Sequence, residues 1–209
     1  MIRAVVSDFG GVLTTPLAGS FQGFADRSGI DLETMGQALA ALHEREGTHP
    51  LHELECGRLT ETAFVENLRA ALVELLGRDV ELASLAETLW EGLFPNDAMI
   101  AFTASLRAAG YRMALLTNNV REWELRWRAL APIDEIFELV VDSAFVGVRK
   151  PDPEIYELTV TGLGVPAGEC LFVDDIEVNC RAAREAGMSA VVFRDTDQAI
   201  TEMRALLDA

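Results

Sequence analysis

Five side chains that could bind a cation or a phosphoryl group stand at or just after hydrophobic runs of this chain. They are Asp8 after IRAVVS, Thr117 at the end of RMALLT, Lys150 shortly after ELVVD, and Asp174 and Asp175 at the end of CLFVDD. Carboxylates a few ångströms apart repel one another, and one of them takes up a proton unless a cation lies between them. If the fold brings these residues together, the three carboxylates therefore indicate a metal site.

The ligand types indicate which metal this would be. Mg²⁺ prefers hard oxygen ligands and typically takes one or two protein carboxylates together with a substrate phosphate. We expect Asp8 and Asp174 to supply the carboxylates. The backbone carbonyl of Gly10 is expected to complete the protein's share, since glycine lets the backbone approach closely. Asp175 is expected to bind through water or to orient the other ligands.

A phosphoryl group is the substrate group that suits such a cluster. Phosphoryl transfer needs positioning and charge neutralisation more than covalent help. The Lys150 ammonium is a compact positive charge, and the Thr117 hydroxyl can donate to a phosphoryl oxygen. Asp8, aimed in line at phosphorus, would form an aspartyl-phosphate that water then hydrolyses.

Each of these residues has a plainer interpretation when it is taken alone. An aspartate or a threonine after a strand often caps the next helix or forms a turn. A loop lysine and an Asp-Asp pair at a turn are commonly no more than solvated charges. The order of the residues along the chain, each at a predicted strand end, favours one common site over separate structural roles.

The elements that must position these residues follow from the hydrophobic periodicity. After Pro95, β-branched runs alternate with helical segments, which predicts a doubly wound α/β fold with a parallel sheet covered on both faces. The predicted strands are 2–7, 112–117, 138–142, 170–175 and 189–193. The predicted helices of this part are 97–109, 121–130, one from Pro153 to Gly162 or Gly164, 177–186 and one from about 196. Ligands bind such sheets beyond the carboxyl ends of the strands, where the five side chains stand.

A helical segment interrupts this pattern after the first strand. Apolar residues recur at helical spacing from about Leu17 to Leu93, with candidate helices at 18–28, 32–45, 61–76 and 81–92 and with Thr60 as an N-cap. We therefore predict two domains. The α/β core comprises 1–15 and 95–209, and an inserted helical cap domain comprises 16–94.

Four motifs of the chain resemble those of haloacid-dehalogenase-like hydrolases, in the same order and over almost the whole length. The motifs are VVSDFGGVL (5–13), ALLTNN (114–119), VRKPDPEIY (148–156) and LFVDDIEVNCRAAREAGM (171–188). The helical insertion is similar to the cap domain of the family's helical type. The resemblance implies a Rossmann-like core and a hydrolase that uses an aspartate nucleophile.

The resemblance also implies a role for each matching residue. Asp8 would be the nucleophile, Thr117 and Asn118 would bind the phosphoryl oxygens, and Lys150 would stabilise their charge. Mg²⁺ would be held by Asp8, the Gly10 carbonyl and Asp174, with help from Asp175. Asn179 would be a structural hydrogen-bonding residue. The substrate would be a small phosphorylated metabolite.

Position 10 departs from the family's pattern. Phosphatases of the family usually carry a second aspartate two residues after the nucleophile, as general acid and base, and this chain has Gly10 there. The form DFGGVL resembles the branch related to the N-terminal phosphatase domain of epoxide hydrolases. General acid–base help is typically worth 10²–10⁴-fold, so the loss should be felt unless Thr14, Thr15 or a cap residue substitutes.

Two other functions are compatible with the same motifs. In a 2-haloacid dehalogenase Asp8 would attack carbon and no metal would be needed, but such enzymes do not keep an acidic pair like Asp174-Asp175, which favours the phosphatase. A non-catalytic domain that binds phosphate or metal for regulation is the second alternative. The intact set of Asp8, Lys150 and Asp174 argues against it.

The overall composition narrows the partners. A net charge of −17 repels phosphate backbones, which argues against nucleic-acid binding. No apolar run approaches the roughly 20 residues of a membrane span, and the N-terminus lacks the apolar segment of a signal peptide, so we expect a cytoplasmic protein that does not bind membranes. The sequence does not indicate an oligomeric state.

The cysteines and histidines form no recognisable metal motif. Three cysteines stand far apart and are interpreted as buried or half-buried thiols, namely Cys56, Cys170 and Cys180. His43, His49 and His52 cluster in the predicted cap, where a solvated helical hairpin is favoured over a metal site. Substrate contacts are expected from the loop 14–23 or from the connection 47–58.

Overall fold

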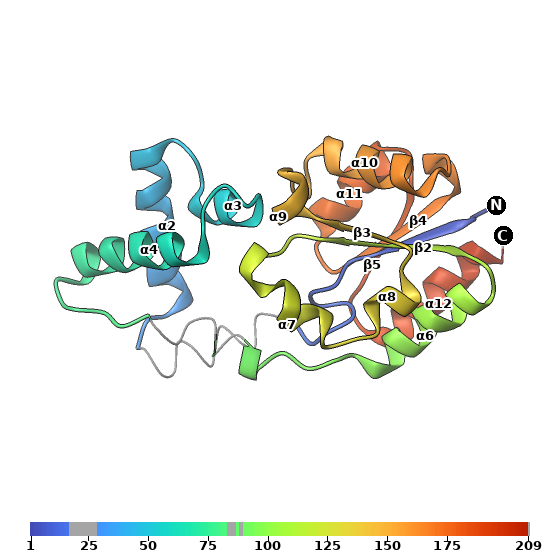
Figure 1. The fold of residues 1–209 in the computed structure, drawn as a ribbon, viewed down its shortest axis with the longest axis horizontal. Helices are drawn as coiled ribbons and strands as arrows, with labels where there is room; N and C mark the ends of the chain where they lie inside the picture. The colour runs from blue at the N-terminus through green and yellow to red at the C-terminus, as the bar shows by residue number, and fades with distance from the viewer. Residues whose placement is uncertain (17–28, 83–86, 88–89, 209) are drawn as a thin grey trace.

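The computed structural model describes residues 1–16, 29–82, 87 and 90–208. Its centre is a five-stranded parallel sheet in the order β3-β2-β1-β4-β5 (Figure 1). The strands are β1 (Ala4–Ser7), β2 (Arg112–Thr117), β3 (Leu139–Asp142), β4 (Cys170–Asp174) and β5 (Ser189–Val192). Each lies within a predicted run. The predicted α/β fold is confirmed.

Helices cover both faces of this sheet because successive strand residues point to opposite sides. Val5 packs into a cluster with Met99 and Met203, whereas its neighbour Val6 packs into a separate cluster with Ile155. The helices on the first face are α6 (Asp97–Ala108), α8 (Ile133–Ile136) and α12 (Thr196–Leu207), and those on the second are α10 (Pro153–Leu163) and α11 (Glu177–Glu185) (Figure 1).

Short elements connect these helices to the strands. They are the 3-10 segments η1 (Arg121–Trp123) and η2 (Ala167–Glu169) and the helices α7 (Glu124–Arg128) and α9 (Ser143–Val146). The predicted helix 121–130 is therefore a 3-10 turn followed by the short helix α7. The hydrophobic residues of this segment do not form the face of one long helix. The segment instead buries Trp127 completely in the core cluster on one face of the sheet.

The insertion after β1 forms a helical cap beside the core (Figure 1). It contains α2 (Leu32–Glu46), α3 (Pro50–Glu55) and α4 (Glu61–Leu76), packed around their own hydrophobic cluster. Gly47 and Gly77 end α2 and α4 in left-handed conformations, and the Thr60 hydroxyl accepts from Ala63 N at the start of α4. The predicted helices 32–45 and 61–76 and the Thr60 cap are confirmed.

Part of the predicted cap has a different or undescribed structure. The connection 47–58 contains a helix, α3, that begins at Pro50 in a first-turn position. The predicted helix 18–28 lies outside the described residues, and so does part of the predicted helix 81–92. Among the described residues, no helix has both the length and the apolar composition that a membrane crossing requires.

Candidate active site

Three adjacent strands end in the residues that the sequence analysis singled out. Asp8 follows β1, Thr117 ends β2 and Asp174 ends β4, and both flanking strands pair with β1 in parallel register. Asp8 N donates to Val173 O at 2.9 Å, so the hydrogen bonding between β1 and β4 continues to Asp8, the candidate nucleophile. All three side chains are buried, and they meet at the carboxyl edge of the sheet.

Lys150 joins two of these strand ends. Its ammonium Nζ donates to Asp8 Oδ1 at 2.7 Å, to Asp174 Oδ2 at 2.7 Å and to the Leu116 carbonyl at 2.9 Å. Its side chain is only 2% exposed. Burial alone would lower the pKa of Lys150, but the carboxylates of Asp174 and Asp8 outweigh this effect and raise it above its ordinary value. Lys150 is therefore a fixed cation inside the site.

Asn118 holds the backbone of this lysine. Its side-chain oxygen accepts from Lys150 N at 2.8 Å, and its side-chain nitrogen donates to Lys150 O at 3.0 Å. The peptide bond between Lys150 and Pro151 is cis. The sequence did not suggest this positioning role for Asn118. Substrate binding by Asn118 and Thr117 remains a prediction.

Asp174 is the most firmly oriented carboxylate. Asn179 Nδ2 donates to its Oδ1 at 3.0 Å and to its Oδ2 at 3.1 Å, and Ile176 N donates to Oδ1 at 2.8 Å. Tyr156 donates its hydroxyl to the Asn179 carbonyl at 2.9 Å. These bonds give Asn179 the structural part that the family resemblance implied.

The carboxylates of Asp8, Asp174 and Asp175 fit a hard divalent cation. One oxygen from each lies within 4.8 Å of the others, and among the described residues this is the only such group of metal-binding side chains. Burial, together with the neighbouring carboxylate of Asp174, raises the pKa of Asp8 to about 7 against the opposing effect of Lys150. Burial and then Asp174 also raise the pKa of Asp175. The cluster therefore carries more negative charge than Lys150 balances, which suits Mg²⁺.

The turn after β1 requires a glycine at position 11. Gly11 has a φ of 78°, and a Cβ added there would lie 2.7 Å from Asp175 Cγ and would collide with its carboxylate. The residue at the family's usual acid position, Gly10, is not among the glycines with positive φ. No role for Gly11 is visible in the sequence, because only the fold brings Asp175 against it.

Gly11→Ala is expected to weaken Mg²⁺ binding by about tenfold or more, because it displaces Asp175 from the carboxylate group. The left-handed backbone also costs about 1–2 kcal/mol for alanine. Gly47→Ala is the matched control, since Gly47 has a similar φ of 76° and nothing within 4 Å of an added Cβ. Calorimetric titration with Mg²⁺ should separate the two variants. Equal affinities would show that Asp175 takes no part in metal binding.

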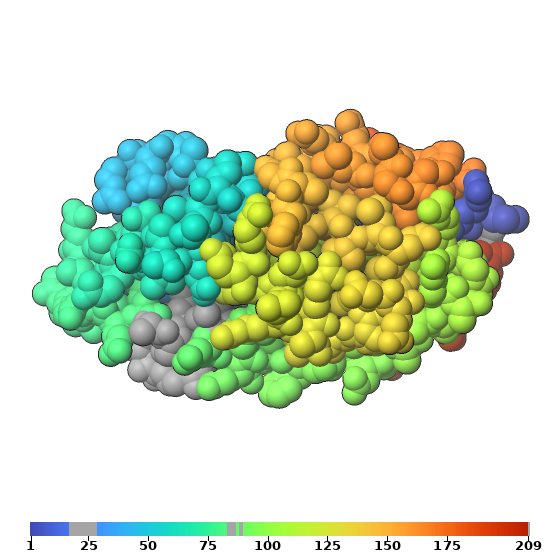
Figure 2. Space-filling view, in the orientation of Figure 1, coloured from blue at the N-terminus to red at the C-terminus, as the bar shows by residue number. Residues whose placement is uncertain are grey.

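A seam of polar contacts attaches the cap to the core, along the boundary seen in Figure 2. Arg149 Nε donates to Glu55 Oε2 at 2.6 Å, and Ser143 donates its hydroxyl to the Glu55 carbonyl at 2.6 Å. Arg58 donates to the Gly147 carbonyl at 2.8 Å. Burial raises the pKa of Glu55 and Arg149 opposes this. The seam fixes the end of α3 beside Lys150 and its loop.

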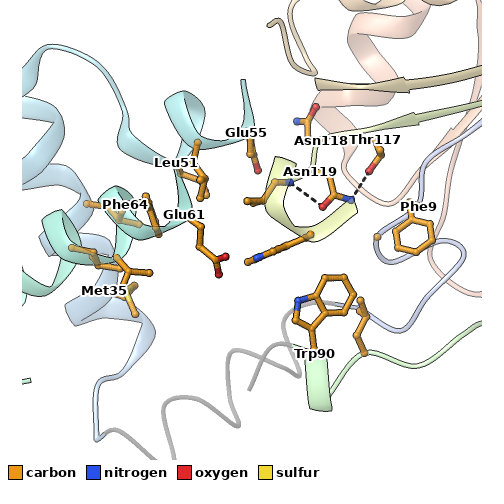
Figure 3. Close-up of a pocket in the computed structure, with 18 residues that line it drawn as sticks. Phe9, Met35, Leu51, Glu55, Glu61, Phe64, Trp90, Thr117, Asn118 and Asn119 are labelled. Carbon is orange, nitrogen blue, oxygen red and sulfur yellow. Dashed lines mark hydrogen bonds between the residues drawn. The ribbon is translucent and has the colours of Figure 1, made fainter. Parts of the chain in front are cut away.

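A cavity of about 270 Å³ lies between the cap and the strand ends (Figure 3). Phe9, Gly10 and residues 117–119 line its core side, and α2, α3 and α4 line its cap side. The expected contribution of the connection 47–58 appears as Leu51, Leu54 and Glu55. Much of the loop 14–23, the other expected contributor, lies outside the described residues.

The cap histidines and the cysteines lie apart from this arrangement. The rings of His49 and His52 stack at 4.5 Å, and His43 lies 5.9 Å from His49, but the described residues contain no histidine metal group. The three cysteines are free and buried.

Comparison with known proteins identifies the family. Residues 2–187 match the haloacid dehalogenase-like hydrolases. The chain belongs to that family. The phosphatase MT3486 of Mycobacterium tuberculosis is 31% identical to this hydrolase over 166 residues, which cover 71% of this chain and 76% of that protein. The resemblance to the epoxide hydrolase branch is also confirmed. Bifunctional epoxide hydrolase 2 of Sus scrofa is 30% identical over 112 residues, which cover 52% of this chain but only 20% of that much longer protein.

Solved structures of the family share the fold of this hydrolase. An enzyme from Bacteroides thetaiotaomicron in complex with magnesium and inorganic phosphate superposes with a TM-score of 0.65 at 22% identity, covering 92% of this chain and 94% of that one. The L-2-haloacid dehalogenase of Xanthobacter autotrophicus gives a TM-score of 0.64 at 24% identity, covering 100% and 84%. At these identities the similarity shows the fold alone, so the reaction must be argued from the site.

Proposed function

We propose that this hydrolase is a Mg²⁺-dependent phosphatase that acts on a small phosphorylated substrate through an aspartyl-phosphate at Asp8. The observation that carries the proposal is the buried Lys150 bonded to both Asp8 and Asp174, beside a third carboxylate from Asp175. Three carboxylates and one lysine suit a metal and a dianionic phosphoryl group together. The phosphatase of Mycobacterium tuberculosis among its relatives supports the same reaction class.

The chain's own residues would act first on the phosphoryl group. Lys150 contacts Oδ1 of Asp8, which orients the carboxylate so that Oδ2 can approach phosphorus in line. As the Asp8–phosphorus bond forms, the bond to the leaving oxygen breaks and its electron pair stays on that oxygen. Thr117, which is buried and lines the cavity, would donate its hydroxyl to a phosphoryl oxygen. Bound Mg²⁺ would supply neutralisation of the phosphoryl charge.

Water completes the reaction by attacking phosphorus of the aspartyl-phosphate. The carboxylate of Asp8 and inorganic phosphate are then released, and the leaving alcohol has gained a proton from water. The two threonines that could substitute for the missing acid already make hydrogen bonds within the protein. Thr14 Oγ1 accepts from Gly11 N and donates to Thr15 O, and Thr15 Oγ1 donates to Gly92 O.

A direct test separates this function from dehalogenation. The hydrolase should release phosphate from para-nitrophenyl phosphate with Mg²⁺, lose this activity with a chelator and regain it when Mg²⁺ is added back. It should release no halide from 2-chloropropionate, whose conversion would need no metal. Halide release that is insensitive to chelator, without phosphate release, would replace the proposal by the dehalogenase alternative. Metal binding without either activity would favour a regulatory domain.

The absence of an acid at Gly10 predicts a strong dependence on the leaving group. Aryl and acyl phosphates should be hydrolysed quickly and simple alkyl phosphates slowly, because an alkoxide departs poorly without a proton donor. Gly10→Asp is expected to accelerate alkyl phosphate hydrolysis by about 10²-fold, the lower end of the typical gain from general acid catalysis, and aryl phosphate hydrolysis much less. Gly10 has no positive φ that would resist aspartate. Steady-state kinetics on ethyl and phenyl phosphate measure both effects.

Equal rates for ethyl and phenyl phosphate in the unmodified protein would contradict this prediction. Another group would then supply the proton, and Glu55 would be the first to test, since it lines the cavity and burial raises its pKa. Glu55→Gln would in that case slow ethyl phosphate more than phenyl phosphate.

A further inference from the structure

The cavity between cap and core begins at the strand ends and continues under the cap helices (Figure 3). This cavity is called the chamber below. Its core end contains Gly10 and Thr117, which flank the carboxylate cluster in the chain and the sheet. A phosphoryl group held at Asp8 would therefore direct the rest of its substrate into the chamber. The wall of the chamber, rather than the catalytic cluster, meets the leaving alcohol.

The chamber wall is built from the hydrophobic faces of the cap helices. Met35 and Leu39 come from α2, Leu51 from α3 and Phe64 from α4. Trp90, which precedes α6, and Trp123 of η1 also line the chamber, and their rings pack edge to face with centroids 5.6 Å apart. Burial of apolar substrate surface against such a wall is favourable by about 25 cal/mol per Å². Among the described residues, the indole Nε1 atoms of Trp90 and Trp123 are buried without a hydrogen-bond partner, so they could each meet one polar atom of the substrate but not a polyhydroxyl group.

The charges of the chamber wall also favour an uncharged leaving alcohol. None of the described residues that line the chamber is a lysine, an arginine or a histidine. The ionisable residues in the described part of the wall are Glu55, which is paired with Arg149, and Glu61. Among the described residues of the wall, a carboxylate or second phosphate on the leaving alcohol would meet no cation, in a protein whose net charge is −17.

We infer that the substrate is a monophosphate ester of an apolar, uncharged alcohol, whose hydrocarbon portion fills the chamber under the cap. This inference rests on the proposed phosphatase function. It separates this hydrolase from phosphatases whose substrates carry a second anionic group or several hydroxyls beside the scissile phosphate. The volume of about 270 Å³ lies near the small end of the about 300–1,000 Å³ of typical ligand pockets, so the hydrocarbon portion is a compact one.

The test is a series of straight-chain alkyl monophosphates from ethyl to hexyl, assayed with Mg²⁺ beside glycerol phosphate and phosphoserine. The alkyl leaving groups have nearly the same acidity, so the series measures burial alone. We expect kcat/KM to rise about two- to fourfold for each methylene that enters the chamber. Glycerol phosphate and phosphoserine should be poorer than the alkyl ester of similar length. A flat series, or a preference for phosphoserine, would overturn the inference.

Acetyl phosphate distinguishes a failure of the proposed phosphatase function from a failure of the inferred substrate class. Its hydrolysis reports the phosphatase function with almost no leaving group to bury. A protein that hydrolyses acetyl phosphate but shows a flat alkyl series keeps the proposed function and loses the substrate class. A protein that hydrolyses neither loses both.

A matched pair of variants localises the effect. Leu39→Arg places a charge on the chamber wall and should flatten the alkyl series. Leu75→Arg makes the same change on α4 at a side chain that is 48% exposed and outside the chamber, and it should leave the series unchanged. A flattened series in both variants, or an undiminished one in Leu39→Arg, would show that the chamber does not hold the alcohol.

Discussion

Asp8→Asn is expected to lower kcat for phosphate release by about 10⁴-fold or more, because it removes the attacking oxygen without changing the size of the side chain. The near-ultraviolet circular dichroism of the variant should match that of the unmodified protein, since asparagine can still accept from Lys150. Substantial phosphatase activity in this variant would show that Asp8 is not the nucleophile.

Asp142→Asn provides the control for this substitution. Asp142 is also a buried aspartate at a strand end, opposite Thr117 in the neighbouring strand. Its Oδ1 accepts from Ala144 N and so caps α9, and it takes no part in the carboxylate group. An asparagine can keep that cap, so the control should change kcat by less than about threefold.

Lys150→Ala is expected to affect both stability and rate. Without the lysine, the buried carboxylates of Asp8 and Asp174 face each other with no cation, which should cost about 3–5 kcal/mol in the free energy of unfolding measured without metal. Mg²⁺ should restore part of that stability, because it neutralises the same carboxylates. The kcat for phosphate release should fall by about 10³-fold or more, since a positive charge on the transferring group is lost.

Urea denaturation with and without Mg²⁺ checks the stability effect, with Arg149→Ala beside it. Arg149 is the neighbouring cation, but it pairs with Glu55 at the cap seam rather than with the carboxylate cluster. Its loss should therefore give a smaller destabilisation that Mg²⁺ does not reverse. If Lys150→Ala is as stable as the unmodified protein in chelator, Lys150 does not balance the buried charge of the cluster.

The strands and the residues at their ends could be predicted because their signals are local. A β-branched run followed by Asp8 and two glycines is visible within ten residues, and the alternation after Pro95 implies parallel pairing. Parallel pairing alone then gathers Asp8, Thr117 and Asp174 at one edge. The cap helices α2 and α4 were predictable for the same reason, from helical spacing that stops at Gly47 and at Gly77.

The remaining features depend on contacts between distant segments. Glu55 and Arg149 are 94 residues apart, and nothing in either local sequence distinguishes them from solvated charges. The need for glycine at position 11 arises from Asp175, which belongs to another strand end. The hold of Asn118 on the Lys150 backbone likewise appears only when β2 and the 150 loop are adjacent.

The chamber is the feature that could least be predicted from the sequence. Its hydrophobic residues follow helical spacing, which from sequence alone indicates only a packed core. The fold leaves part of that surface facing the strand ends, where the inferred apolar alcohol would bind.

The central claim is that Asp8 carries the phosphoryl group during turnover, and trapping that intermediate tests it most directly. The protein is mixed with Mg²⁺ and excess para-nitrophenyl phosphate and quenched in acid within milliseconds, and the peptide containing Asp8 is analysed by mass spectrometry. We predict one phosphoryl group on Asp8, formed with Mg²⁺ and absent with chelator or in Asp8→Asn. Steady phosphate release with Asp8 unmodified at every quench time, and retained in Asp8→Asn, would contradict the account.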